Sequence, residues 1–150
     1  MEFTTLGRTG LKVSVASLGC GGGSSLGQKL GKSEAHSVSI VKKAMDLGVN
    51  FIDTANAYGT ETIVGKAIKD MPRDQVVIST KHHAIWSGKK YSPDEVIAGL
   101  ENSLRELGTD YVDIFHLHGV RTTTHRMWLV ARATPIGGER KGKNSLFGHH

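Results

Sequence analysis

The sequence lacks the features that mark a cross-linked or membrane-bound protein. Cys20 is the only cysteine among 150 residues, so no disulfide can form within the chain. No run of about 18 apolar residues is present, and no segment has the pattern of a signal peptide. Internal repeats and low-complexity segments are also absent. These absences lead us to expect a cytoplasmic protein of single-domain length with no membrane segment.

Positive charge is in excess, but the excess is confined to one end of the chain. Residues 1–121 carry 14 Lys and Arg against 13 Asp and Glu, so most of the net charge of +5 belongs to residues 122–150. Neither part shows a helical basic stripe or a basic segment interleaved with aromatic residues. We therefore expect no nucleic-acid partner.

Hydrophobic patterns and capping residues predict an alternation of strands and helices. A turn at residues 7–10 separates two apolar stretches, as in a β-hairpin. The predicted helices begin after Ser33, at Glu61 and after Ser92, and end near Gly48, Pro72 and Gly108. Predicted strands cover residues 15–19, 51–53, 76–81 and 111–118. Such an alternation indicates parallel β–α units, which build a barrel or an open sheet.

Four polar residues follow or end three of these strands, namely Asp53, Tyr58, Lys81 and His118. The carboxyl ends of parallel barrel strands converge on one mouth, where barrel enzymes place their catalytic residues. A lysine cation stabilises a phenolate, and an aspartate can hold that lysine charged and in place. The four residues therefore predict a site in which tyrosine donates a proton near neutral pH.

The strings FIDTANAYG (51–59), VVISTK (76–81) and YVDIFHLH (111–118), with the opening MEFTTLGRTGLKVSVASLGCGG, resemble the aldo-keto reductase family. The resemblance extends from residue 1 to about 121. It implies an α/β protein of the (β/α)8 TIM-barrel type, preceded by an N-terminal β-hairpin. It also implies that NADPH or NADH reduces an aldehyde or ketone to an alcohol, which makes a small carbonyl compound the expected partner.

The same resemblance assigns roles to individual residues. Tyr58 is expected to be the general acid, with Lys81 and Asp53 as its tuning partners. His118 is expected to orient the substrate carbonyl, and Trp86 to contribute to the substrate pocket. Asp53 is also the expected cofactor contact, and no metal is expected.

The chain is shorter than the barrel that it resembles, which takes about 250 residues. Four strands of eight are recognisable, so we expect a barrel truncated after the fourth strand. Residues 122–150 are expected to be a poorly ordered basic tail outside the family pattern. If codons 143–149 are read one nucleotide later, they can encode KIRFLGI, which matches the family and suggests a frameshift.

A barrel that stops after four strands leaves its first and fourth strands with open edges. Open edges expose unpaired backbone groups, so we expect self-association of such a chain. This expectation supports an alternative in which the chain is an inactive half-barrel or an interaction fragment.

His116 competes with His118 for the catalytic role. The two residues lie two positions apart on one strand, so they share a face and spacing alone cannot choose between them. The family pattern of an aspartate followed five residues later by a histidine fits Asp113 and His118.

A metal-dependent barrel hydrolase is the lesser alternative, because His116 and His118 form an H-x-H pair. Catalytic zinc takes three protein ligands, and Asp53 could supply the third. His82 and His83 are adjacent on a strand, so only one of them could face a shared site.

Overall fold

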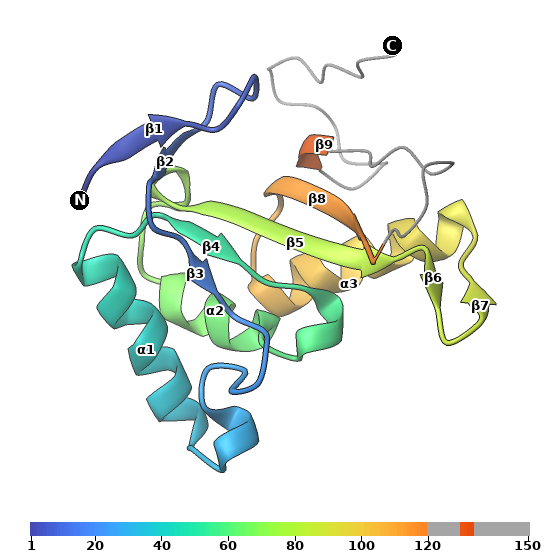
Figure 1. Ribbon diagram of the computed structural model, residues 1–150, viewed down its shortest axis with the longest axis horizontal. Helices are drawn as coiled ribbons and strands as arrows, with labels where there is room; N and C mark the ends of the chain where they lie inside the picture. Colours follow the sequence, from blue (N-terminus) through green and yellow to red (C-terminus); the bar gives the residue numbers. More distant parts are fainter. Residues whose placement is uncertain (120–129, 134–150) are drawn as a thin grey trace.

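The computed structural model describes residues 1–119 and 130–133, and its centre is a parallel sheet covered by helices on one side (Figure 1). The sheet order is β3 (Leu18–Gly19), β4 (Phe51–Asp53), β5 (Val77–His83) and β8 (Val112–His118), and neighbouring strands run parallel. The helices are α1 (Glu34–Asp46), α2 (Glu61–Ile68) and α3 (Pro93–Leu107). The predicted β–α units are therefore confirmed. This arrangement matches one half of the expected barrel.

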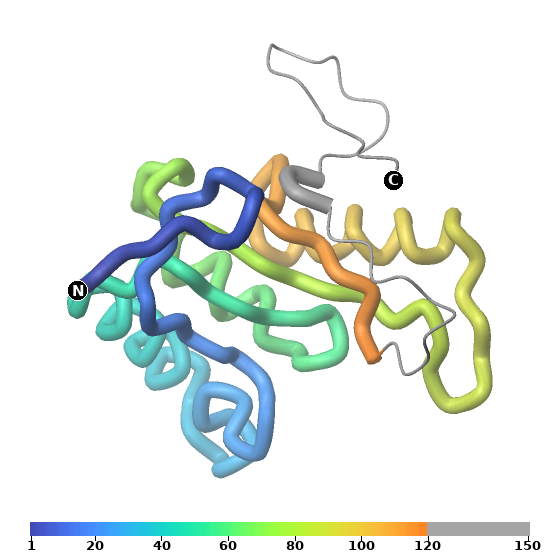
Figure 2. The backbone as a smooth tube through the Cα atoms, turned by 45° about the horizontal axis from the view of Figure 1, so that its top comes forward, coloured from blue at the N-terminus to red at the C-terminus, as the bar shows by residue number. Residues whose placement is uncertain are grey.

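The predicted N-terminal hairpin is also present. β1 (Phe3–Thr5) pairs antiparallel with β2 (Lys12–Ser14), and the hairpin lies on the sheet face away from the helices (Figure 2). Val13 packs in one buried cluster with Val77 and Ile114. The hairpin therefore covers the part of the sheet where the strands begin and leaves their carboxyl ends uncovered.

Capping residues determine where the helices begin, as the sequence predicts. The Ser33 hydroxyl accepts a hydrogen bond from the first turn of α1. At α3, the Ser92 hydroxyl accepts from the Glu95 amide at 3.2 Å, and the Glu95 carboxylate accepts from the Ser92 amide at 2.8 Å. This capping box satisfies two amides that have no partner within the helix. Gly108 ends α3 with a φ of 65°, a conformation that suits glycine.

A second hairpin was not predicted from the sequence. β6 (Ile85–Trp86) pairs with β7 (Lys89–Lys90) across a turn in which Ser87 and Gly88 have φ values of 48° and 82°. Two successive positive φ values define the tight turn that best matches the strand twist. The hairpin follows β5 directly and therefore brings Trp86 to the carboxyl end of that strand.

The expectation of an open edge at the fourth strand is wrong. β9 (Val130–Ala133) pairs antiparallel with β8, with Ile114 opposite Ala131. The pairing satisfies backbone groups that an open edge would leave exposed. β3 remains an end strand among the described residues. The expected boundary at residue 121, the expected start of a frame-shifted reading between residues 121 and 128, and the string at 143–149 lie outside the described residues.

A buried carboxyl group joins α2 to the sheet. The Glu61 side chain is fully buried, and it accepts a hydrogen bond from the Thr80 hydroxyl at 2.6 Å. Its second oxygen, Oε2, has no hydrogen-bond partner among the described residues. Burial is the main reason that the pKa of Glu61 is raised, because a charged carboxylate is poorly solvated there.

We expect this group to make stability depend on pH. Because the pKa is raised in the folded state, folding takes up a proton, and the stabilising effect is present in full below about pH 4.3, the ordinary value for glutamic acid. It is lost as the pH rises through the folded-state pKa. Denaturant unfolding at several pH values should show this loss in the wild type and not in Glu61→Gln.

The matched control is Glu2→Gln, which removes an exposed carboxyl group and should retain the wild-type pH dependence. Equal pH dependence of the wild type and Glu61→Gln would contradict the assignment.

None of the helices in residues 1–119 has the length and hydrophobicity needed to cross a bilayer.

Candidate functional site

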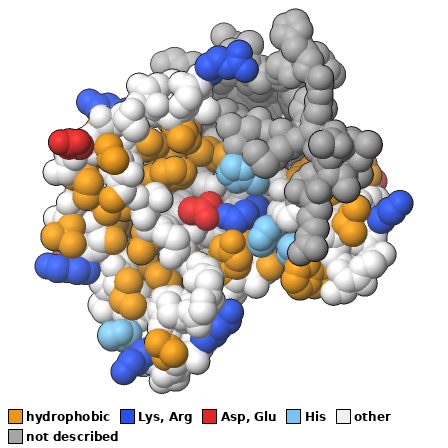
Figure 3. All heavy atoms as spheres, viewed as in Figure 1, with side chains coloured by type: hydrophobic (Ala, Val, Ile, Leu, Met, Phe, Trp, Pro, Cys, Tyr) orange, Lys and Arg blue, Asp and Glu red, His pale blue; other side chains and the backbone are white. Residues whose placement is uncertain are grey.

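The four residues expected at the site lie together at the carboxyl ends of the central strands. Asp53 ends β4, Lys81 lies near the end of β5, and His118 ends β8. Tyr58 lies on a short 3-10 helix, η2 (Asn56–Tyr58), soon after β4. Acidic, basic and histidine side chains gather at the centre of one face of the molecule (Figure 3). The expected convergence of these strand ends is confirmed, and the catalytic roles remain predictions.

Lys81 and Asp53 form a close ion pair. The Lys81 Nζ lies 2.6 Å from both carboxylate oxygens of Asp53, and it also donates to the Thr54 carbonyl at 2.9 Å. The Lys81 side chain is 14% exposed and that of Asp53 is 37% exposed. The ammonium group therefore has a fixed position, while part of the carboxylate remains accessible.

Tyr58 lies between this ion pair and His118. The Lys81 Nζ is 5.3 Å from the centre of the Tyr58 ring. The ring of His118 meets that of Tyr58 edge to face, with 5.5 Å between centroids and 89° between planes. A Cβ atom at Gly21 would lie 2.7 Å from the Tyr58 ring, so only glycine lets the backbone approach the ring this closely.

The structure distinguishes the two histidines that spacing could not. The ring of His118 contacts Tyr58, whereas the Nε2 of His116 lies 3.1 Å from the Ser79 hydroxyl. Ser79 in turn donates to Asp53 at 2.9 Å. His116 is thus hydrogen-bonded to Ser79 beside the ion pair, and His118 is the histidine whose ring contacts the tyrosine.

Both histidines are placed where the neutral imidazole is favoured. Burial is the main reason that the pKa of His116 and of His118 is lowered. The positive charge of Lys81 lowers both further, and the nearby Asp53 carboxylate opposes the effect. A neutral imidazole retains one N–H group, which can donate a hydrogen bond to a carbonyl oxygen.

Sequence reasoning missed Ser79 as part of the site, and it weighed His83 as a possible metal ligand but not as a neighbour of His118. Ser79 and His83 each lie two positions from Lys81 on β5, so side-chain alternation places all three on one face of the sheet. The sequence could have indicated Ser79 and His83 through this alternation of side chains along β5. His83 contacts both His118 and Trp86. Trp86 is 56% exposed and lies at the rim of the site, where the resemblance expects a substrate contact.

The described residues contain no group of three His, Cys, Asp or Glu side chains arranged to hold a metal ion. His116 bonds to Ser79, and Asp53 is paired with Lys81. Cys20 lies beside the site and is fully buried, and burial raises the pKa of its thiol to about 12. The thiol is therefore an uncharged packing group.

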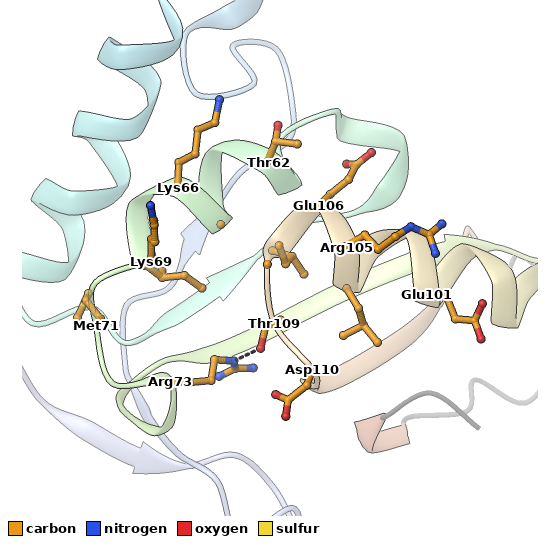
Figure 4. Close-up of a pocket in the computed structure, with 15 residues that line it drawn as sticks. Thr62, Lys66, Lys69, Met71, Arg73, Glu101, Arg105, Glu106, Thr109 and Asp110 are labelled. Carbon is orange, nitrogen blue, oxygen red and sulfur yellow. Dashed lines mark hydrogen bonds between the residues drawn. The ribbon is translucent and has the colours of Figure 1, made fainter. Parts of the chain in front are cut away.

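A groove of about 1040 Å³ lies on the helix side of the molecule, between α2 and α3 (Figure 4). Its charged side chains are of both signs and include Lys66, Arg105, Glu106 and Asp110. The groove shares no residue with the tyrosine site.

Comparisons with known proteins agree with the family resemblance of the sequence. The sequence model described as "Aldo/keto reductase family" matches residues 17–135, which extends past the boundary expected at residue 121. The aldo-keto reductase YhdN of Bacillus subtilis is 38% identical over 79% of this chain. This chain spans 38% of the length of that relative.

Solved structures give the same result. Aldo-keto reductase AKR11C1 from Bacillus halodurans, in its holo form, is similar over 81% of this chain and 41% of its own, with a TM-score of 0.66 and 32% identity. An aldo-keto reductase from Bombyx mori in complex with NADP is similar over 76% of this chain and 36% of its own, with a TM-score of 0.61 and 28% identity.

Proposed function

Because the chain belongs to the aldo/keto reductase family, we propose that it supplies the catalytic residues for reduction of an aldehyde or ketone to an alcohol by NADPH or NADH. The observation that carries the proposal is the contact of Tyr58 with both His118 and the Lys81–Asp53 ion pair. A tyrosine, a lysine and a neutral histidine at one strand-end site form a set of groups suited to proton donation.

The residues present fit a nicotinamide cofactor at its reactive end. The Asp53 carboxylate remains 37% exposed although it is paired with Lys81, so it can contact a bound ligand. When bound, the nicotinamide would supply the hydride, and the protein would position it. The NADP present in the Bombyx mori relative supports this choice of cofactor.

Tyr58 acts as the proton donor in the proposed mechanism. Negative charge develops on the carbonyl oxygen as the substrate is reduced, and Tyr58 donates its hydroxyl proton to that oxygen. Lys81 stabilises the resulting phenolate through its positive charge, and Asp53 and the Thr54 carbonyl hold the ammonium group in place. His118 donates its N–H to the same carbonyl oxygen and stabilises the developing charge.

Cofactor binding tests the proposal directly. Trp86 lies at the rim of the site, so its fluorescence should be quenched as NADPH is added to the chain. The measurement is made in a Trp128→Phe background, which leaves Trp86 as the only tryptophan. NADH, added in a parallel titration, shows which cofactor binds more tightly.

The quenching should saturate and should persist in Tyr58→Phe, because the hydroxyl group acts on the substrate. Absence of NADPH and NADH binding would contradict the proposal. It would favour the alternative of an inactive half-barrel, since the chain spans about two fifths of the relatives it matches.

We also propose a location in the cell and a mode of self-association for this chain. A cytoplasmic location agrees with the single, buried cysteine, since disulfide-rich chains belong to oxidising compartments. Self-association through the outer edge of β3 agrees with the position of this strand at the end of the sheet. Size-exclusion chromatography that gives a monomer would contradict the second point.

A further inference from the structure

The His83 ring stacks on the ring of His118. His118 is the side chain that donates a hydrogen bond to the substrate in the proposed mechanism. We propose that His83 is a positioning residue that holds the His118 ring facing Tyr58 in its uncharged form. The inference rests on the proposed function for the role of His118 in catalysis. The contact between the two histidines is independent of that function.

The rings of His83 and His118 are parallel. Their centroids are 4.2 Å apart and their planes differ by 7°. The His118 ring also contacts the Tyr58 ring, but edge to face, with 5.5 Å between the two ring centroids. His118 is thus held by two aromatic neighbours in perpendicular orientations, which restricts rotation of its ring.

Trp86 restrains His83 in turn. The Trp86 ring lies 4.2 Å from the His83 ring with 32° between their planes. The stack of Trp86, His83 and His118 therefore runs from the exposed rim to the catalytic tyrosine. Since Trp86 belongs to the β6–β7 hairpin, the hairpin that follows β5 contributes to the position of His118.

A hydrogen bond determines which His83 nitrogen carries a proton. The Nδ1 of His83 lies 3.3 Å from the His118 backbone carbonyl. A carbonyl oxygen only accepts, so Nδ1 is the donor in this bond. The bond also ties the His83 ring to the backbone of the residue on which it stacks.

The remaining buried nitrogens disfavour a charged His118. Within the described part of the chain, the Nδ1 of His118 and the Nε2 of His83 are buried without a hydrogen-bond partner. A second proton on the His118 ring would place its Nδ1–H where no acceptor lies among the described residues, which costs free energy. Nε2 is therefore the His118 nitrogen that is left to donate to a substrate.

The neighbours of His118 that can carry a positive charge also favour its uncharged form, whereas the Asp53 carboxylate opposes it. His83 and Lys81 face His118 from β5, Tyr58 from η2 and Asp53 from β4, and His116 lies on its own strand. The pKa of His118 is lowered by burial, then by charge on His83 and on Lys81, and Asp53 opposes this.

Two variants separate the effect of charge from that of stacking. His83→Phe keeps a flat ring against His118 and removes the titratable group, whereas His83→Gln removes both ring and charge. We expect the His118 titration midpoint, followed by NMR in the full chain without ligand, to move upward in both variants. The contact between His118 and Tyr58, detected as a nuclear Overhauser effect, should persist in His83→Phe and be lost in His83→Gln.

The matched control is His82→Gln, which replaces the neighbouring histidine on the opposite face of β5, where it contacts Tyr91. It should change neither readout, and the exposed His36 provides an internal reference signal. An unchanged His118 midpoint in both His83 variants would overturn the inference, as would a His118–Tyr58 contact that survives in His83→Gln. These measurements need no cofactor or turnover, so their failure is distinct from failure of the proposed function.

Discussion

Replacing Tyr58 with phenylalanine is expected to lower kcat for carbonyl reduction by about 10²- to 10⁴-fold, the usual contribution of a positioned acid. The substitution removes only the hydroxyl group. The ring contacts with His118 and Lys81 do not depend on that group, and the close approach of Gly21 to the ring is unchanged. The fold and cofactor binding should therefore be preserved. Steady-state oxidation of NADPH, in a form of the protein shown to reduce a carbonyl compound, measures the loss.

Tyr91→Phe is the matched control for this prediction. Tyr91 also packs edge to face on a histidine, His82, with 5.1 Å between ring centroids, but it does not contact the ion pair of the site. Its loss of a hydroxyl group should leave kcat close to the wild-type value. Turnover retained by Tyr58→Phe would refute the assignment of Tyr58 as the proton donor.

Replacing Lys81 with methionine is expected to have an effect on kcat of similar size, about 10²- to 10³-fold, as for other electrostatic groups aimed at a developing charge. Methionine has a similar length and no charge. It leaves the Asp53 carboxylate and the Thr54 carbonyl without the ammonium group that each now contacts within 3 Å. Asp53 keeps the hydrogen bond from Ser79 but loses its ion pair, and the phenolate loses its neighbouring cation.

The same substitution should also destabilise the fold, but by less than the ~3–5 kcal/mol that follows when a fully buried pair is broken. The reason is that Asp53 is 37% exposed and water can solvate part of its charge. Denaturant unfolding measures this loss alongside kcat. Lys66→Met provides the control, because the Lys66–Glu34 pair is more than half exposed on both sides.

Unchanged kcat in Lys81→Met would exclude a catalytic role for the ammonium group. A loss of kcat that is fully restored by adding Asp53→Asn to Lys81→Met would show a different cause, namely that the unpaired carboxylate was the inhibitory feature. The double variant therefore distinguishes a direct effect of the lysine from an effect of the orphaned aspartate.

Local patterns predicted the helices and their order correctly. Ser33 and Ser92 cap α1 and α3 as expected, because capping depends on residues within one helical turn. The β6–β7 hairpin was missed because its strands are two residues long, which is too short for a hydrophobic alternation to be recognised. β9 was missed because its pairing with β8 is a contact between segments, and no local pattern records it.

The candidate site shows the same division between local and long-range information. Residue type and strand position were sufficient to predict Asp53, Tyr58, Lys81 and a histidine of β8 as site residues, since the ends of parallel strands meet at one edge of the sheet. They were not sufficient to separate His118 from His116, because both side chains lie on the same face of β8. The relative positions of η2 and β5 decide that Tyr58 meets one and Ser79 the other.

The sequence by itself determined the family resemblance, the alternating β–α order and the chemical types of the site residues. These features depend on short-range rules of capping, periodicity and motif spacing. Only the tertiary structure decided that His83 stacks on His118, that Ser79 links His116 to Asp53, and that Gly21 must make room for Tyr58. Such contacts join side chains from separate strands and loops, so they exist only once the sheet has brought those segments together.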